Sequence, residues 1–173
     1  LGIDATTAGS VVGTYWFLMF VGRFVGGALG AKFSSKAMLS FVASLGLCFV
    51  LLAIFLPTDI LVNMPVFNKN ISFGLAQVPV TVMLLTLCGL CTSVMWGGIF
   101  NLATEGLGKY TAAASGIFMV MVCGGGILST LQSYVADIFG YVQSYWVVIL
   151  GLAYILYYAL VGSKNVNKDI VVN

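Results

Sequence analysis

Five long apolar stretches constrain the fold of this chain more than any other feature of its sequence. A helix needs about 20 apolar residues to cross the hydrocarbon core of a bilayer. Each stretch reaches that length, and Arg23 is the one charged residue inside them. We therefore predict five transmembrane helices, at about residues 9–31, 37–56, 80–104, 112–136 and 142–162.

The amino-acid composition indicates that most of the chain is surrounded by lipid and not by water. Of the 173 residues, 61% are hydrophobic and 7% are charged, and the mean hydropathy is +1.10. A soluble domain carries roughly 25% charged residues, so this chain could not cover a surface that faces water on all sides. The sequence predicts an all-α, polytopic membrane protein, with residues 1–173 forming one transmembrane unit.

Several kinds of chemistry are disfavoured by the side chains present. The net charge of +2 is too small to indicate a nucleic-acid partner. The chain has no histidine, and no carboxylate lies within the five stretches. Cys88 and Cys91 have C-x-x-C spacing, but without a second ligand pair helix packing is a better interpretation than a metal or redox role. We expect no cofactor, no metal and no catalytic residue.

The basic residues predict an orientation in the membrane. If the first helix runs inward, one basic residue is external and six lie at or near the cytoplasmic side, which the positive-inside rule favours. The N-terminus is then outside, residues 57–79 form a turn-rich external loop, and the tail 163–173 is cytoplasmic. Because the chain begins outside with Leu1 and has an odd number of spans, we also expect further upstream helices in a longer protein. The external residue is Lys69, and the other six are Arg23, Lys32, Lys36, Lys109, Lys164 and Lys168.

The third stretch is the most polar and predicts a surface that faces a cavity or a partner helix. Trp96 lies near its middle, away from the interfacial belt where membrane Trp residues usually gather. An aromatic ring suits the apolar CH face of a sugar, and Asn101, Gln132 and Tyr15 could form hydrogen bonds with the sugar hydroxyls. Simple packing is the alternative for Trp96, and a bond to the neighbouring helix is the alternative for Asn101.

Arg23 is the second candidate functional feature. It lies about eight residues before the end of the first stretch, roughly 12 Å at 1.5 Å per residue. One interpretation is an ion pair with Glu105 at a cytoplasmic gate. The other is that the long side chain of Arg23 extends to the lipid headgroups.

Three segments resemble one family of transporters. They are Val-Gly-Arg-Phe-Val-Gly at 21–26, Ile-Phe-Asn-Leu-Ala-Thr-Glu-Gly-Leu-Gly-Lys at 99–109, and Gly-Gly-Gly-Ile at 124–127 with Ala136-Asp137 after it. This pattern resembles the C-terminal half of the fucose–galactose–glucose:proton symporters, within the major facilitator superfamily. The resemblance implies that the five spans are helices eight to twelve of twelve, that the tenth lines the cavity, and that the proton-coupling carboxylates lie in the other half.

By this resemblance the chain is a fragment of a proton-coupled glucose/galactose or fucose symporter of a bacterial inner (plasma) membrane. It would work by alternating access about a site near the bilayer midplane. Its partners would be the sugar, protons, the missing N-terminal helices and the lipid bilayer. The alternative is a small structural membrane subunit that packs with partner helices and binds no solute. A membrane enzyme would need an acid–base pair or a metal set, which the spans do not offer.

Overall fold

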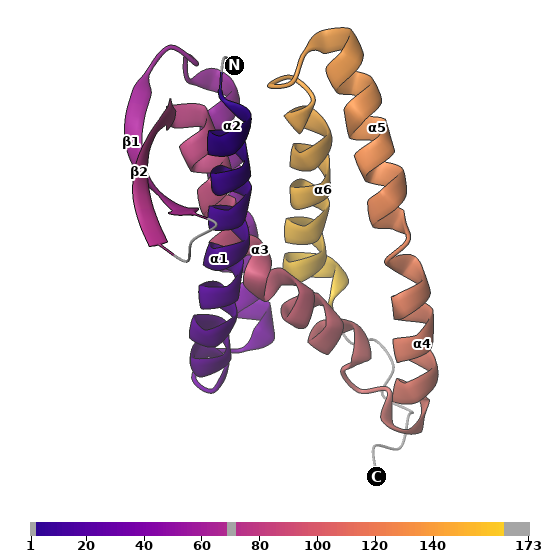
Figure 1. Ribbon diagram of the computed structural model, residues 1–173. Helices are drawn as coiled ribbons and strands as arrows, with labels where there is room; N and C mark the ends of the chain where they lie inside the picture. Colours follow the sequence, from indigo (N-terminus) through magenta and orange to yellow (C-terminus); the bar gives the residue numbers. More distant parts are fainter. Residues whose placement is uncertain (1–2, 69–71, 165–173) are drawn as a thin grey trace.

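Helices of membrane length dominate the computed structural model, which describes residues 3–68 and 72–164 (Figure 1). Five helical segments of the described chain are long and apolar enough to cross a membrane. The predicted all-α, polytopic membrane fold is confirmed, with one hairpin added to it. In chain order the elements are α1 (Ala5–Gly30), α2 (Ser35–Phe55), β1 (Leu61–Asn68), β2 (Ser72–Pro79), α3 (Val80–Thr104), η1 (Gly108–Tyr110), α4 (Thr111–Met121), α5 (Gly124–Phe139), α6 (Tyr145–Tyr157) and η2 (Tyr158–Gly162).

The main apolar core lies where α2 packs between α3 and α6. Apolar residues recur along α2 at the helical spacing that places them on one face. Leu39 and Ala43 are completely buried there, and Val50 is nearly so. The same cluster contains Cys91 and Met95 of α3, with Ile149, Leu152 and Ala159 from α6 and η2.

Helices α1 and α3 approach each other through glycine. A Cβ atom on Gly89 would lie 2.7 Å from the backbone oxygen of Tyr15, and one on Gly26 would lie 2.6 Å from a methyl group of Val94. Both distances are too short for a real side chain. Lipid supplies no hydrophobic force between two membrane helices, so close packing of small residues is what holds them together.

The segment predicted as an irregular loop at 57–79 contains an antiparallel hairpin, which is a correction to the sequence prediction. β1 pairs with β2 in a register that joins Leu61 to Pro79, and the hairpin lies beside α1 (Figure 1). The backbone N–H of Phe67 donates to Thr14 Oγ1 at 2.8 Å, and the Phe67 ring stacks on Phe17 with centroids 5.2 Å apart. Residues 69–71 lie outside the described part, as does the predicted tail from position 165 onward.

The fourth span is broken in its middle and stands apart from α1. The break at Val122 and Cys123 precedes the three glycines at 124–126. Around it the backbone N–H groups of Val122 and Cys123 bond to carbonyls three residues back, at 3.2 Å each, instead of four. This tighter local winding separates α4 from α5. In Figure 1, α5 lies next to α6, on the far side of the bundle from the hairpin.

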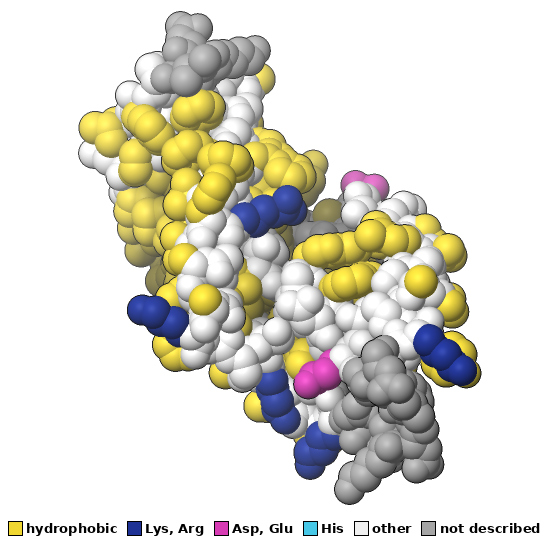
Figure 2. All heavy atoms as spheres, turned by 90° about the horizontal axis from the view of Figure 1, so that it is seen from below, with side chains coloured by type: hydrophobic (Ala, Val, Ile, Leu, Met, Phe, Trp, Pro, Cys, Tyr) yellow, Lys and Arg dark blue, Asp and Glu magenta, His cyan; other side chains and the backbone are white. Residues whose placement is uncertain are grey.

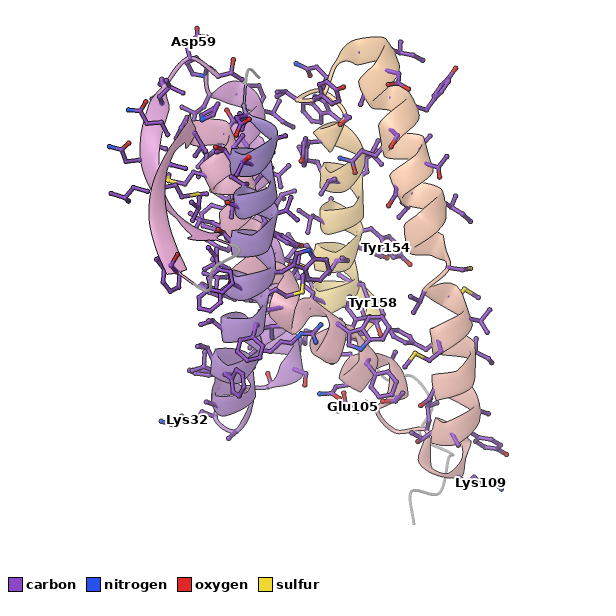
Figure 3. The ribbon with its side chains drawn as sticks, viewed as in Figure 1. Lys32, Asp59, Glu105, Lys109, Tyr154 and Tyr158 are labelled. Carbon is purple, nitrogen blue, oxygen red and sulfur yellow. The ribbon has the colours of Figure 1, made fainter. Side chains whose placement is uncertain are left out.

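Charged side chains mark the two ends of the bundle. Lys32, Glu105 and Lys109 lie at one end, and Asp59 lies at the other (Figure 3). Figure 2 views the molecule from the end that bears the two lysines and shows Lys and Arg side chains spread across it. The bundle therefore has a basic end and an opposite end, where Asp59 lies and the hairpin strands begin and end.

Candidate functional site

A polar link between α1 and α3 lies in the interior of the bundle. The hydroxyl of Tyr15 and Oγ1 of Thr92 are 3.1 Å apart and share a hydrogen bond. Thr92 Oγ1 also lies 3.1 Å from the carbonyl oxygen of Cys88, to which it can donate. Because Gly89 lets α1 come close to α3, the two hydroxyls can meet without any other residue between them.

Beside this link lies a large cavity, with a volume of about 830 Å³. Small-molecule pockets in proteins typically measure roughly 300–1,000 Å³. Helices α1, α3, α5 and α6 form its walls. Its lining includes Tyr15, Thr92 and Gln132, so two of the residues predicted to bind sugar share it.

One face of α5 supplies most of the polar groups on the far wall of the cavity. The residues concerned recur at the three- and four-residue steps that place side chains on one side of a helix. They surround Gln132 with hydroxyls and place a carboxylate at the helix end. These residues are Ser129, Gln132, Ser133, Ala136 and Asp137.

Thr81, at the start of α3, also lines the cavity and has an unsatisfied hydroxyl group. Its side chain is 2% exposed, and its Oγ1 has no hydrogen-bond partner within the part of the chain that the structure describes. A buried hydroxyl without a partner costs about 1–3 kcal/mol. Thr81 is therefore a weak point in the packing at the start of α3.

Trp96 lies one turn of α3 beyond Thr92, outside the cavity lining. Four residues along a helix correspond to about 6 Å of rise and a turn of about 40° in direction. The indole is 44% exposed and meets the ring of Phe118 of α4 edge to face, with centroids 5.1 Å apart. Phe100 contacts the same Phe118 ring at 5.4 Å. Trp96 thus belongs to a half-exposed aromatic cluster just past the end of the cavity that Thr92 lines.

Asn101 lies elsewhere, in a second groove between the ends of α1 and α3 and the start of α2. The groove has a volume of about 400 Å³ and includes Arg23 in its lining. The Asn101 amide donates to Ser35 Oγ at 3.5 Å, a long hydrogen bond to the neighbouring helix. Glu105 caps the end of α3, does not line the groove, and forms no ion pair with Arg23 in this structure.

The structure therefore divides the residues that the sequence singled out. Tyr15 and Gln132 share the large cavity, Trp96 lies one turn beyond it, and Asn101 and Arg23 lie in the second groove. Sequence reasoning missed Thr92 as a partner of Tyr15, and it missed the polar face of α5. The three- and four-residue spacing of polar side chains from 129 to 137 was the signal available for that face.

The described residues contain no group of side chains that could bind a metal ion. Among residues 3–68 and 72–164, no three His, Cys, Asp or Glu side chains gather closely enough to hold a metal ion. Cys88 and Cys91 are free thiols on α3, half-buried and buried respectively. The cavity lining offers hydroxyl, amide and carboxylate groups that can form hydrogen bonds.

Comparison with known proteins identifies the relatives of the chain. It is 31% identical over 170 residues to a putative glucose/galactose transporter of Helicobacter pylori (strain J99), a match that covers 95% of this chain. It is also 31% identical over 164 residues to the glucose/galactose transporter of Brucella abortus (strain 2308), with the same coverage. The chain is a homologue of bacterial sugar transporters. A weaker match, 25% identical over 139 residues, joins it to the L-fucose-proton symporter of Escherichia coli (strain K12).

These matches confirm the predicted resemblance to the fucose–galactose–glucose:proton symporters. The homologue described here spans about a third of the length of the transporters it matches, namely 37% and 35% of the two glucose/galactose proteins. No family model matches the chain, and no solved structure matches it. Its five described helices of membrane-spanning length agree with those of a transporter.

Proposed function

We propose that this chain forms the C-terminal part of a proton-coupled sugar symporter, in which it lines one side of the substrate path. The observation that supports this most strongly is the match to glucose/galactose transporters over 95% of the chain. The fucose-proton symporter among the relatives extends the substrate class to deoxyhexoses and supports proton coupling. The length of these relatives supports the presence of further helices, which would complete the path.

The sugar would bind at the inner end of the large cavity, between the Tyr15–Thr92 link and Trp96. The half-exposed indole offers a flat apolar face to the CH groups of a pyranose ring. Tyr15, Thr92 and Gln132 offer hydroxyl and amide groups that can replace the water bound to the sugar hydroxyls. Asn101 would take part only if the inner groove joins this path in another conformation.

Proton coupling would depend on groups beyond the described spans. Asp137, near the outer end of α5, is the one carboxylate that lines the cavity, and none occurs in the middle of a described span. Alternating access requires gates that form in one state and break in the other. Arg23 lies in the inward half of α1 and Glu105 directly follows α3, and we assign their ion pair to a conformation different from this one.

Transport by the purified full-length protein, which contains the helices that complete the path, tests this function. We expect proteoliposomes to take up galactose, glucose or fucose when the external pH is lower than the internal pH, and Trp96→Ala to reduce that uptake strongly. Trp146→Ala is the matched control, because Trp146 is also 44% exposed but lies on α6 against Phe55. Equal uptake with and without the pH gradient would show that transport is not coupled to protons. No uptake of any hexose would contradict the proposed function.

The bacterial inner membrane and the orientation belong to the same proposal. The basic end, which bears Lys32 and Lys109, would face the cytoplasm, and Asp59 would face outward (Figure 3). In a protein whose native cysteines are replaced, Asp59→Cys should react in intact cells with a maleimide that cannot cross membranes, and Lys109→Cys should not. The reverse labelling pattern would invert the orientation.

A further inference from the structure

We propose that the groove between the ends of α1 and α3 and the start of α2 binds the phosphate of an anionic membrane lipid. Its volume of about 400 Å³ leaves room for a phosphate group with its ester arms. The proposal is independent of sugar transport, since it depends only on the groove and on the membrane around it. The groove is lined by Arg23, Gly26, Gly27, Gly30, Ser35, Met38, Ser93, Val94, Gly97, Gly98 and Asn101.

The polar groups of the groove suit an anion. Arg23 provides a guanidinium, Asn101 an amide and Ser35 a hydroxyl, and no carboxylate lines the groove. Within the described chain Arg23 forms no ion pair and no hydrogen bond, although it lies inside a membrane-spanning helix. An unpaired charge there is costly. A phosphate satisfies the planar guanidinium with two parallel hydrogen bonds.

Glycine keeps the groove open. A Cβ atom added to Gly27, Gly30 or Gly97 would meet nothing within 4 Å, so these positions face empty space and not a packed neighbour. Gly26 and Gly98 differ, because a Cβ atom there would press on Val94 or Leu39. The open glycines thus form the free wall of the groove, while the other two hold the helices together.

The position of the groove favours a lipid over a free anion. Arg23 precedes the end of α1 by seven residues, roughly 10 Å of helix, a distance that a long side chain can largely cover. That end of α1 is at the basic end of the bundle, where Lys32 lies (Figure 3). Met38 and Val94 add apolar surface next to the donors. Basic pockets between membrane helices on the cytoplasmic side bind anionic headgroups in this way.

Lipid binding to the purified protein in detergent, measured by native mass spectrometry, tests the site. The probe is dioctanoyl phosphatidylglycerol, with dioctanoyl phosphatidylcholine and inorganic phosphate as the comparison ligands. We expect Arg23→Gln to weaken phosphatidylglycerol binding at least about tenfold, since a charge-assisted hydrogen bond is lost. Lys32→Gln is the matched control, because Lys32 is exposed at the same end but does not line the groove.

A second pair of variants tests the groove without changing its charge. Gly27→Leu fills it, whereas Gly9→Leu places the same side chain in open space at the other end of α1. Only Gly27→Leu should weaken phosphatidylglycerol binding. The proposal is overturned if Arg23→Gln binds the lipid like the wild type, if wild type binds no phosphatidylglycerol, or if millimolar inorganic phosphate displaces it completely, which would indicate a free-anion site.

Discussion

Within the described part of the chain, helices α1, α2 and α3 pack closely, whereas α4 and α5 have few packing partners. In the membrane-spanning window of Val80–Thr104, 44% of the residues are buried, against none in that of Gly108–Phe139. Yet the fourth span has the same features that hold α1 to α3, namely glycines and hydroxyl side chains on one face. The difference between these two regions shows that small and polar residues make a membrane helix suitable for close packing. The helix still needs a partner of matching shape.

The comparison also separates two uses of polar side chains. In α1 and α3, Tyr15 and Thr92 satisfy each other. On α5, Ser129 and Ser133 bond only to backbone oxygens of their own helix, and Gln132 faces the cavity. In the first region the hydroxyls already bond to each other across two helices. The second presents groups to whatever fills the cavity, whether a solute or another helix.

The largest effect should come from filling the contact between α1 and α3. Gly89→Leu would drive a side chain into the backbone oxygen of Tyr15, which cannot move aside. We expect a loss of stability at the upper end of roughly 1–3 kcal/mol, measured as a lower melting temperature of the purified protein. Gly116→Leu in α4, where nothing lies within 4 Å of the added Cβ, should change the melting temperature little. Equal losses in the two variants would abolish the distinction between the regions.

A smaller effect should follow from removing the bond that holds the hairpin to α1. Thr14→Val keeps the shape of the side chain but leaves the Phe67 N–H without its acceptor. The expected cost is about 1–2 kcal/mol, within the range for an unsatisfied buried donor, with faster amide hydrogen exchange in β1. Thr130→Val on α5 removes only a bond to the backbone of its own helix. Unchanged exchange in β1 after Thr14→Val would show that the hairpin does not depend on this bond.

The smallest effect expected is an energetic coupling between Arg23 and Glu105, at the C-terminal ends of α1 and α3. If Arg23 and Glu105 pair in another transport state, Arg23→Ala and Glu105→Ala should each slow transport. The double variant should lose less than the sum of the two, by about 0.5 kcal/mol or more in activation free energy. Strictly additive losses in initial uptake rates would show that the two side chains act separately.

Much of this architecture could be predicted from the sequence, and particular residues show why. Apolar length alone indicates the spans, because a membrane helix must satisfy its own backbone. The hairpin escaped prediction because Pro65, Gly74 and several asparagines suggest turns, while its order depends on contacts with Thr14 and Phe17 far away in sequence. The link between Tyr15 and Thr92 is of the same kind, since 77 residues separate the two.

The candidate site shows the same limit. Polarity and position indicated Trp96, Asn101, Gln132 and Tyr15 one at a time, but only the helix packing shows which of them meet. Gly89 of α3 determines that Tyr15 reaches Thr92, and the open glycines of α1 determine that Arg23 lies in a groove. A periodicity of small residues predicts close approach without naming the partner helix.

Sugar binding by calorimetry tests the central claim most directly, that the surface around Trp96 receives the sugar. With galactose or fucose as titrant, Trp96→Ala should weaken affinity roughly five- to hundredfold, as expected for a loss of about 1–3 kcal/mol. Trp96→Phe should retain part of the affinity, since a smaller ring still offers a stacking face. Trp146→Ala, equally exposed on α6, should bind like the wild type. If Trp96→Ala also binds like the wild type, the sugar does not contact α3 at this position and the account of the site is wrong.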